Sequence, residues 1–227
     1  MNVCAIVVAA GKGTRMGVNI NKVYLELKGY PVLLYALKLF QRSPLIKNII
    51  IVAAEGQEAK AAEIVAKYGI SKAGLIVKGG NSRYESVKNA LAFVEEKTDF
   101  VAVHDGARPL LTEEDLVKVI YAAESADGAI LAYPMQDSIK QSEDISVKKS
   151  LERKELWGAM TPQVFAFTKL LRAYEAGNET ATDDSQLVEE VGGKDLIVEG
   201  RKDNLKITTP LDLRLAELIL ESRGANK

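Results

Sequence analysis

The chain has 227 residues, of which 47% are hydrophobic and 27% charged, and its formal net charge is −1. This composition is typical of a globular protein, and its charge balance gives no indication of binding to nucleic acid or membrane. The single cysteine, Cys4, excludes a disulfide within the chain. The N-terminal apolar run is cut short by glycines, which predicts neither a signal peptide nor a membrane anchor, so we expect a cytoplasmic protein.

The apolar run at residues 3–9 contains valine, isoleucine and alanine without polar alternation, which is typical of a strand buried on both faces of a parallel sheet. The basic loop after it contains Gly11, Gly13 and Arg15 and leads to Lys22. Glycines lack a Cβ atom, so backbone N–H groups there can approach an anion closely, and the two cations add positive charge at the same place. We therefore predict a phosphate-binding loop.

Two common nucleotide-binding motifs do not fit this loop. A Walker loop requires Lys and then Ser or Thr after its last glycine, whereas Gly17 is followed by Val18. A Rossmann fingerprint requires a third glycine, where this chain has Met16, and an acidic residue about 20 positions later. The next predicted strand ends too late for that, at Glu55. The remaining alternative is an ordinary glycine-rich turn with two solvated cations.

Beyond the loop, helices and strands alternate along the chain. Apolar residues at helical spacing, capping motifs and helix-ending glycines predict helices over residues 31–42, 57–68, 82–96, 112–125, 168–176, 183–191 and 211–222. Short apolar runs predict strands over residues 48–53, 74–77, 99–103, 128–133, 196–198 and 205–207. This alternation predicts an α/β fold with a doubly wound, mostly parallel sheet.

One segment interrupts the pattern. From about residue 134 to 157 apolar residues are sparse and charges are frequent, so we expect an arm that projects from a single domain spanning residues 1–227. Such a polar arm gains burial by crossing onto a second copy of the chain, which predicts a homodimer with Trp157 as an interface anchor.

Loops that follow parallel strands meet at one edge of the sheet, and ligands of such sheets bind there. The polar side chains expected at this edge are Arg15, Lys22, Asn81, Arg83, Ser86, Asp105, Arg108, Lys206 and Thr208. Asp105 is a lone carboxylate among cations, which suits a Mg²⁺ ion that bridges it to phosphate oxygens. The alternatives for Asp105 are capping a turn or pairing with Arg108. For His104, the single histidine, a structural role is favoured over that of a general base.

The helix predicted after the glycine turn at Gly79 and Gly80 begins with Ser82 and Glu85 at the spacing of a capping box. This start is expected to leave backbone N–H groups free near Asn81 and Ser82. Backbone groups and small polar side chains at fixed positions suit the edge of a pyrimidine base, which predicts a preference for CTP.

Four motifs, in order along the chain, resemble those of the 2-C-methyl-D-erythritol 4-phosphate cytidylyltransferases of the non-mevalonate isoprenoid pathway. They are Ala9-Ala10-Gly11-Lys12-Gly13-Thr14-Arg15-Met16-Gly17 followed by Lys22, Val103-His104-Asp105-Gly106-Ala107-Arg108-Pro109, Leu156-Trp157 before Thr161-Pro162-Gln163, and Asn204-Leu205-Lys206-Ile207-Thr208. The chain departs from the family at Asn21 and Val23, where the family commonly has Pro and Gln.

The resemblance implies a Rossmann-like nucleotidyltransferase fold, a homodimer, Mg²⁺ as cofactor, and transfer of CMP from CTP to the sugar-alcohol phosphate with release of pyrophosphate. By resemblance, Arg15 and Lys22 stabilise charge on the α-phosphate, while Arg153 and Lys206 hold the attacking phosphate. The nucleotide-binding residues would be Ala10, Gly11, Gly13, Thr14, Gly80, Asn81, Arg83, Ser86 and Asp105. The residues binding the second substrate would be Arg108, Ser138, Arg153, Thr182 and Lys206.

Two alternatives remain open. The ribitol-5-phosphate cytidylyltransferases share the loop and the pair His104-Asp105, although Leu156-Trp157 after Arg153 favours the first family. A non-catalytic nucleotide-binding protein on the same fold would tolerate loss of the phosphate-positioning cations, all of which are present here.

Overall fold

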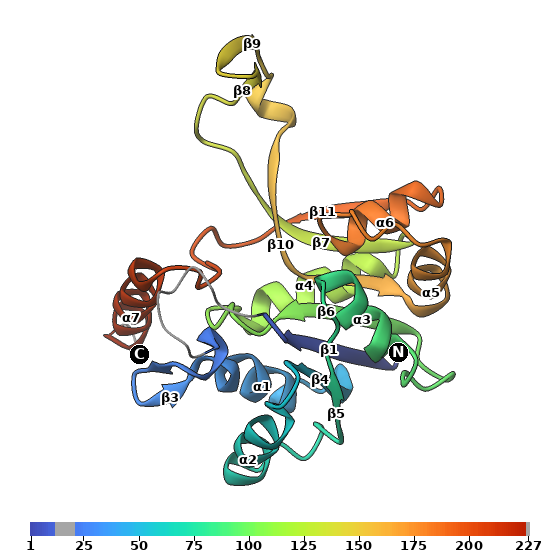
Figure 1. Ribbon diagram of the computed structural model, residues 1–227, viewed down its shortest axis with the longest axis vertical. Coiled ribbons are helices and arrows are strands. Elements are labelled where there is room, and N and C mark those ends of the chain that lie inside the picture. The colour runs from blue at the N-terminus through green and yellow to red at the C-terminus, as the bar shows by residue number, and fades with distance from the viewer. Residues whose placement is uncertain (12–20, 226–227) are drawn as a thin grey trace.

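The computed structural model describes residues 1–11 and 21–225, and these form a seven-stranded central sheet (Figure 1). In chain order its strands are β1 (Val3–Ala9), β4 (Ile46–Ala53), β5 (Leu75–Lys78), β6 (Phe100–Asp105), β7 (Gly128–Pro134), β10 (Trp157–Ala166) and β11 (Asp195–Glu199). Their order across the sheet is β11–β7–β10–β6–β1–β4–β5, and within the described residues only β10 runs antiparallel to its neighbours. The predicted mostly parallel sheet is confirmed.

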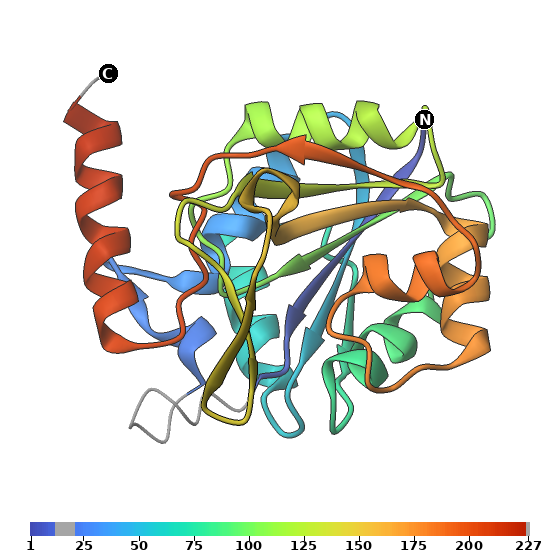
Figure 2. The same ribbon diagram turned by 90° about the horizontal axis from the view of Figure 1, so that it is seen from above.

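Both faces of the sheet are covered by helices (Figures 1 and 2). Alternate residues of β1 join opposite cores, as a strand requires: Val3, Ala5 and Val7 on one face, Cys4 and Ile6 on the other. The first core is closed by α1 (Val32–Arg42), α2 (Glu58–Tyr68) and α4 (Glu113–Ala123), the second by α3 (Arg83–Leu91), α5 (Phe167–Ala176) and α6 (Asp184–Glu190). The unbroken apolar sequence of β1 is thus explained by burial on both faces.

The last helix, α7 (Pro210–Ala225), lies apart from these two layers (Figure 2). It packs against the short hairpin of β2 (Glu26–Leu27) and β3 (Tyr30–Pro31), where a third small core forms. That core contains Leu27, Val32, Leu110, Ile207 and Ala216. No helix in the described part of the chain combines the length and apolarity needed to span a membrane.

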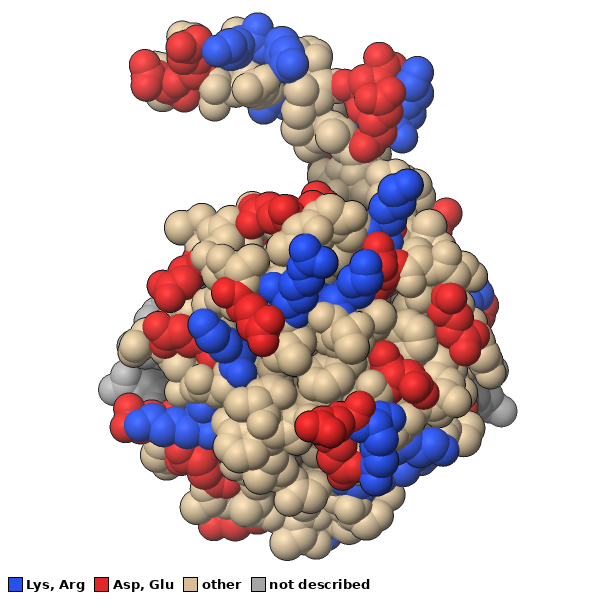
Figure 3. Space-filling view, turned by 90° about the vertical axis from the view of Figure 1, so that its right-hand side faces the viewer, with Lys and Arg blue, Asp and Glu red and all other residues tan. Residues whose placement is uncertain are grey.

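The charged segment after β7 leaves the body of the molecule (Figures 1 and 3). It contains the hairpin of β8 (Lys140–Glu143) and β9 (Ser146–Ser150), then the 3-10 turn η3 (Arg153–Glu155). Every residue of β8 and β9 is exposed, and charges of both signs cover the end of the arm. The hairpin of β8 and β9 therefore gains almost no burial within its own chain.

Two local predictions are wrong. Residues 205–207 form no strand, because the apolar side chain of Ile207 packs into the core beside α7; a single backbone hydrogen bond, from Ile207 N to Ala107 O at 2.8 Å, ties the segment down. The helix predicted to reach residue 96 ends at Leu91. Glu95 and Glu96 follow, and acidic side chains disfavour continuation at the negative end of a helix dipole.

Candidate active site

A cleft of about 310 Å³ opens at the carboxyl ends of β1 and β6 and beside the start of α3. The predicted site residues that line it are Ala10, Gly11, Lys22, Gly80, Asn81, Arg83, Ser86, Asp105, Lys206 and Thr208. They come from four loops far apart in the sequence, so the sheet edge brings them together as expected. Arg108 does not line the cleft but contacts Asp105 from behind.

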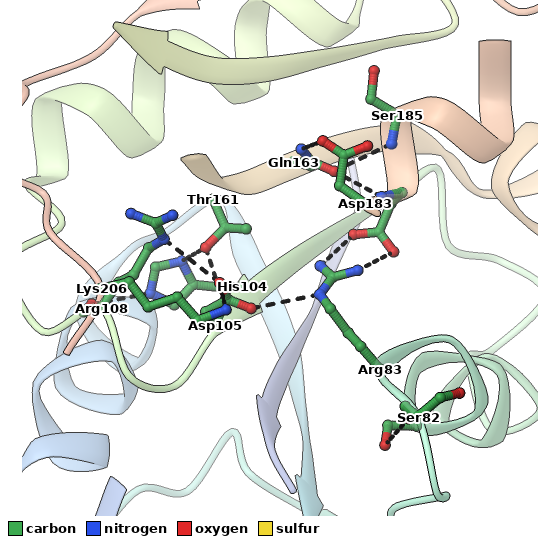
Figure 4. A network of polar contacts seen from close by, with 12 residues as sticks. Ser82, Arg83, His104, Asp105, Arg108, Thr161, Gln163, Asp183, Ser185 and Lys206 are labelled. Carbon is green, nitrogen blue, oxygen red and sulfur yellow. Dashed lines mark hydrogen bonds and ion pairs between the residues drawn. The ribbon is translucent and has the colours of Figure 1, made fainter. Parts of the chain in front are cut away.

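Asp105 lies at the centre of three cations, and its side chain is only 9% exposed (Figure 4). Its Oδ2 lies 2.8 Å from Nζ of Lys206 and 3.5 Å from Nε of Arg108, while Oδ1 lies 3.6 Å from Nε of Arg83. Burial alone would raise the pKa of Asp105, but the positive charges of Lys206, Arg83 and Arg108 outweigh it and hold the pKa well below its usual range. The carboxylate is therefore ionised at neutral pH, and the three cations around it leave an excess of positive charge.

Arg83 is held from its other side by a buried carboxylate (Figure 4). Its Nη1 and Nη2 donate to Oδ1 and Oδ2 of Asp184 at 3.0 and 2.6 Å, a bidentate pair. Asp184 is completely buried at the start of α6, and the hydroxyl of Tyr174 on α5 donates to the same Oδ1 at 2.6 Å. Arg83 is thereby linked to the helical layer on one side and to Asp105 on the other.

His104 has both ring nitrogens occupied and does not face the cleft. Nε2 lies 3.2 Å from the carbonyl oxygen of Arg108, so it is the nitrogen that donates. Nδ1 then accepts from the hydroxyl of Thr161, also at 3.2 Å, and Thr161 Oγ1 in turn accepts the backbone N–H of Asp105. Complete burial lowers the pKa of His104 to about 4. A neutral histidine with two partners has the structural role favoured by the sequence analysis.

Asn21, one of the two departures from the resembled family, orders the segment that carries Lys22. Its Oδ1 accepts the N–H of Val23 and caps the 3-10 turn η2 (Lys22–Tyr24), while its Nδ2 donates to the carbonyl of Ala9 at 2.8 Å and to Gln57 at 3.0 Å. The end of β1 is thus tied to η2, and the nearly buried Lys22 lines the cleft.

The glycine turn packs too closely for any larger residue. A Cβ atom at Gly79 would collide with Ala10, and one at Gly80 with Glu85. The N–H of Asn81 is not free as expected, because it donates to Oε2 of Glu85 at 2.5 Å. The Ser82 side chain does accept from the N–H of Glu85, as the capping box predicts. The Glu85 carboxylate therefore holds the turn at Asn81, and Gly80, Asn81, Ser82 and Ser86 line the cleft.

Several buried polar residues around the cleft were not singled out by the sequence analysis. Gln163 on β10 accepts the N–H groups of Asp184 and Ser185 at 3.0 and 3.2 Å and donates to Asp183 at 2.9 Å, which fixes the start of α6 (Figure 4). Asn204 donates to the carbonyl of Thr161 at 3.1 Å. Thr161, Gln163 and Asn204 lie in the motifs that resemble the family's. Asp184 has no signal in the sequence except that it follows another aspartate, Asp183.

Some predicted site residues lie elsewhere. Arg153 and Ser138 are on the arm, where Arg153 Nη1 donates to the carbonyl of Gln136 at 2.7 Å, and neither lines the cleft of its own chain. Thr182 is exposed just before α6 and its N–H donates to Gln186. The predictions for Gly13, Thr14 and Arg15 lie outside the described residues.

A fully protein-bound metal site is not formed within residues 1–11 and 21–225, where no three His, Cys, Asp or Glu side chains gather closely enough to hold an ion. Asp105 is the only carboxylate among the described residues lining the cleft. Mg²⁺ commonly takes one or two protein carboxylates and completes its shell with phosphate oxygens and water. Asp105 fits such a site only when a phosphate ligand supplies the other oxygens.

Comparison with known proteins agrees with this geometry. The sequence profile of the 2-C-methyl-D-erythritol 4-phosphate cytidylyltransferase family matches residues 3–222. Proteins of that name from Caldanaerobacter subterraneus and Clostridium acetobutylicum are each 43% identical to this chain, over 97% of its length and 99% and 98% of theirs. The crystal structure of 4-diphosphocytidyl-2C-methyl-D-erythritol synthase from Anaerococcus prevotii superposes with a TM-score of 0.84 at 30% identity, covering 96% of this chain and 98% of that one. The Francisella tularensis cytidylyltransferase gives a TM-score of 0.81 at 30% identity, with coverage of 96% and 99%.

Proposed function

The chain belongs to the 2-C-methyl-D-erythritol 4-phosphate cytidylyltransferase family, a family of nucleotidyltransferase enzymes, and from this premise we propose its reaction. It transfers CMP from CTP to 2-C-methyl-D-erythritol 4-phosphate and releases pyrophosphate and 4-diphosphocytidyl-2-C-methyl-D-erythritol. The observation that carries the proposal is the cluster of Arg83, Arg108 and Lys206 around the single carboxylate Asp105, in a cleft walled by the glycine turn.

The chemistry needs cations more than it needs a base. A phosphate oxygen of the methylerythritol phosphate attacks the α-phosphorus of CTP, a new P–O bond forms, and the bond to the pyrophosphate leaving group breaks. A phosphate monoester is already anionic at neutral pH, so the barrier lies in bringing two anions together. His104 is buried, neutral and occupied at both nitrogens, which agrees with a reaction that uses no histidine base.

We assign the cations to two substrates. Lys22 and Arg15 belong to the α-phosphate, since both follow the β1 strand closely in the sequence, and Lys22 lines the cleft. Lys206 belongs to the incoming phosphate, together with Arg153. Lys206 is paired with Asp105 at 2.8 Å, so it is available to a phosphate once Asp105 gains another cationic partner.

That partner is Mg²⁺ in this proposal. Asp105 would hold the ion together with phosphate oxygens of CTP, and the ion would supply positive charge between the phosphates. The role of this chain is to keep Asp105 ionised, which the surrounding cations do by lowering its pKa. With the ion on Asp105, Lys206 would be available to the incoming phosphate.

We also propose a cytoplasmic homodimer formed through the arm at residues 134–157. Arg153 and Ser138 do not reach the cleft of their own chain, yet the family resemblance assigns both to the second substrate. A two-fold partner resolves this difference, because the exposed arm of one chain would bring these residues to the cleft of the other.

The decisive experiment offers the purified chain CTP with methylerythritol 4-phosphate or with ribitol 5-phosphate, in the presence of Mg²⁺, and measures pyrophosphate. We expect release with the first acceptor, much less with the second, and little with ATP in place of CTP. Preference for ribitol 5-phosphate would assign the alternative family. Binding of CTP without turnover on either acceptor would indicate a non-catalytic nucleotide-binding protein.

A further inference from the structure

The orientation of the Arg83 guanidinium is fixed by a buried partner. Asp184 takes both terminal nitrogens in a bidentate pair at 3.0 and 2.6 Å. Nε lies on the side of Asp105, 3.6 Å from its Oδ1 (Figure 4). A lysine at this position would present one point charge without a preferred plane. The orientation of Arg83 toward the cleft is therefore set from behind, by Asp184.

Asp184 is itself held rigidly. Its carboxylate is completely buried and accepts the hydroxyl of Tyr174 at 2.6 Å in addition to Arg83. Its backbone N–H donates to Gln163 at 3.0 Å, so the residue is fixed to β10 as well as to α5. Carboxylate, hydroxyl and guanidinium together form a chain of charge-assisted bonds that ends at the cleft.

A buried ion pair of this kind adds little net stability, because the loss of hydration offsets most of the attraction between the charges. Removing one partner is costly, whereas an apolar pair of similar volume is often as stable. Stability alone therefore gives no reason for an arginine and an aspartate here. The pair does fix a cation beside Asp105, and that placement matters to a ligand with several negative charges.

We propose that Asp184, supported by Tyr174, is a positioning residue for the nucleotide, acting through Arg83. It holds the guanidinium so that the cation faces the triphosphate instead of collapsing onto Asp105. Without the Asp184 charge, Asp105 is the remaining carboxylate within reach of Arg83, and a closer pair between them would block the place of the metal. This inference rests on the proposed function.

The test is a double-mutant cycle between Asp184→Asn and Arg83→Met, read as kcat/KM for CTP. We expect Asp184→Asn to lower this quantity at least tenfold while KM for the sugar phosphate stays within about threefold. In the Arg83→Met background the same change should cost less than about twofold, because the residue through which Asp184 acts is gone. An Asp184→Asn enzyme within twofold of the unmodified chain, or a double variant that falls by the product of both singles, would overturn the proposal.

Two further variants separate positioning from folding. Asp195→Asn is the matched control. Asp195 on β11 accepts from Ser185 of α6 at 2.8 Å and, within the described residues, forms no hydrogen bond or ion pair with Arg83, so we expect unchanged kinetics. A tenfold loss of kcat/KM for CTP in Asp195→Asn would mean that any weakening of the contacts of α6 lowers activity, which contradicts the proposal. If Asp184→Asn does not fold, Tyr174→Phe removes one hydroxyl only. It should lower kcat/KM for CTP about threefold, and not at all when Arg83 is Met; any other result contradicts the proposal.

CTP binding measured by calorimetry gives a readout that does not depend on turnover. We expect the Kd for CTP to rise at least tenfold in Asp184→Asn and to stay unchanged in Asp195→Asn. If the unmodified chain shows no turnover, the proposed reaction fails while this binding comparison still stands. If the unmodified chain turns over and Asp184→Asn binds CTP normally, only the positioning role is lost.

Discussion

Nζ of Lys206 lies 2.8 Å from Oδ2 of Asp105, although the two residues come from distant parts of the chain. In the strand predicted over residues 205–207, alternation of side chains would simply point Lys206 to solvent. The segment is not a strand, and the Lys206 side chain is 36% exposed and lines the cleft. Lys206 is thus placed where a phosphate oxygen could replace the Asp105 carboxylate as its partner.

We expect Lys206→Ala to raise KM for methylerythritol 4-phosphate and to lower kcat, while the affinity for CTP stays within a few fold. The loss should be on the order of 3 kcal/mol of transition-state stabilisation, as for other groups that stabilise developing charge. Steady-state kinetics with each substrate varied in turn measure it. Lys118→Ala removes an exposed lysine on α4 that pairs with Glu114, and it should leave both constants unchanged. A defect confined to CTP would contradict the assignment.

Arg153 and Lys206 should act as a unit. Both are assigned to one phosphate dianion, so the double variant Arg153→Ala with Lys206→Ala is expected to cost less than the two single changes added together. The comparison uses kcat/KM for the sugar phosphate in all four proteins. Full additivity would indicate that the two cations serve different groups.

Asp105→Asn should remove Mg²⁺-dependent turnover by on the order of 100-fold, or about 3 kcal/mol. The change removes the one carboxylate that lines the cleft among the described residues. It also leaves Lys206 and Arg108 without their carboxylate partner, while Arg83 keeps Asp184. We expect a smaller loss of unfolding free energy, part of which added pyrophosphate should restore by supplying negative charge. Calorimetric melting with and without pyrophosphate measures this; a large stability loss with turnover retained would mean that Asp105 serves the fold alone.

Mixed dimers test whether Arg153 works across an interface. In a heterodimer of an Arg153→Ala chain and a Lys22→Ala chain, one of the two clefts would hold an intact Lys22 from one chain and an intact Arg153 from the other. We expect neither homodimer to be active and the purified heterodimer to regain about half of the unmodified activity. Differently tagged chains allow its isolation. An inactive heterodimer would assign Arg153 to its own chain's cleft.

Acid should destabilise the protein through His104. Burial lowers the pKa of His104 to about 4 in the folded state, against about 6.5 in the unfolded chain, so the unfolded state binds more protons between these values. Stability should therefore fall as the pH drops from 6.5 to 4, by about 3 kcal/mol in total. Asp195 acts in the opposite sense, because burial raises its pKa to about 6. Urea unfolding across this range should give a shallower pH dependence in His104→Gln and a steeper one in Asp195→Asn.

The parts of the site that the sequence predicted are those set by single strands. Lys22, Asp105 and the glycine turn each follow an apolar run, so their meeting at one sheet edge follows from strand order in any parallel sheet. Gln163 and Asp184 could not be placed in this way. Their contacts depend on the insertion of β10 between β6 and β7 with opposite direction, which alternation of strands and helices does not reveal. The strand predicted over residues 205–207 was wrong because their apolar side chains pack into the small core beside α7 and not into the central sheet.

The arm has a natural point of excision. The backbone N–H of Leu151 donates to the carbonyl of Ile139 at 3.0 Å, so the two strands of the arm meet directly below the hairpin of β8 and β9. Replacing the residues between Ile139 and Leu151 by a short glycine-containing turn would remove the hairpin and keep both Arg153 and Trp157 in the chain. The arm could therefore be shortened by protein engineering without removing Arg153, the cation at its base.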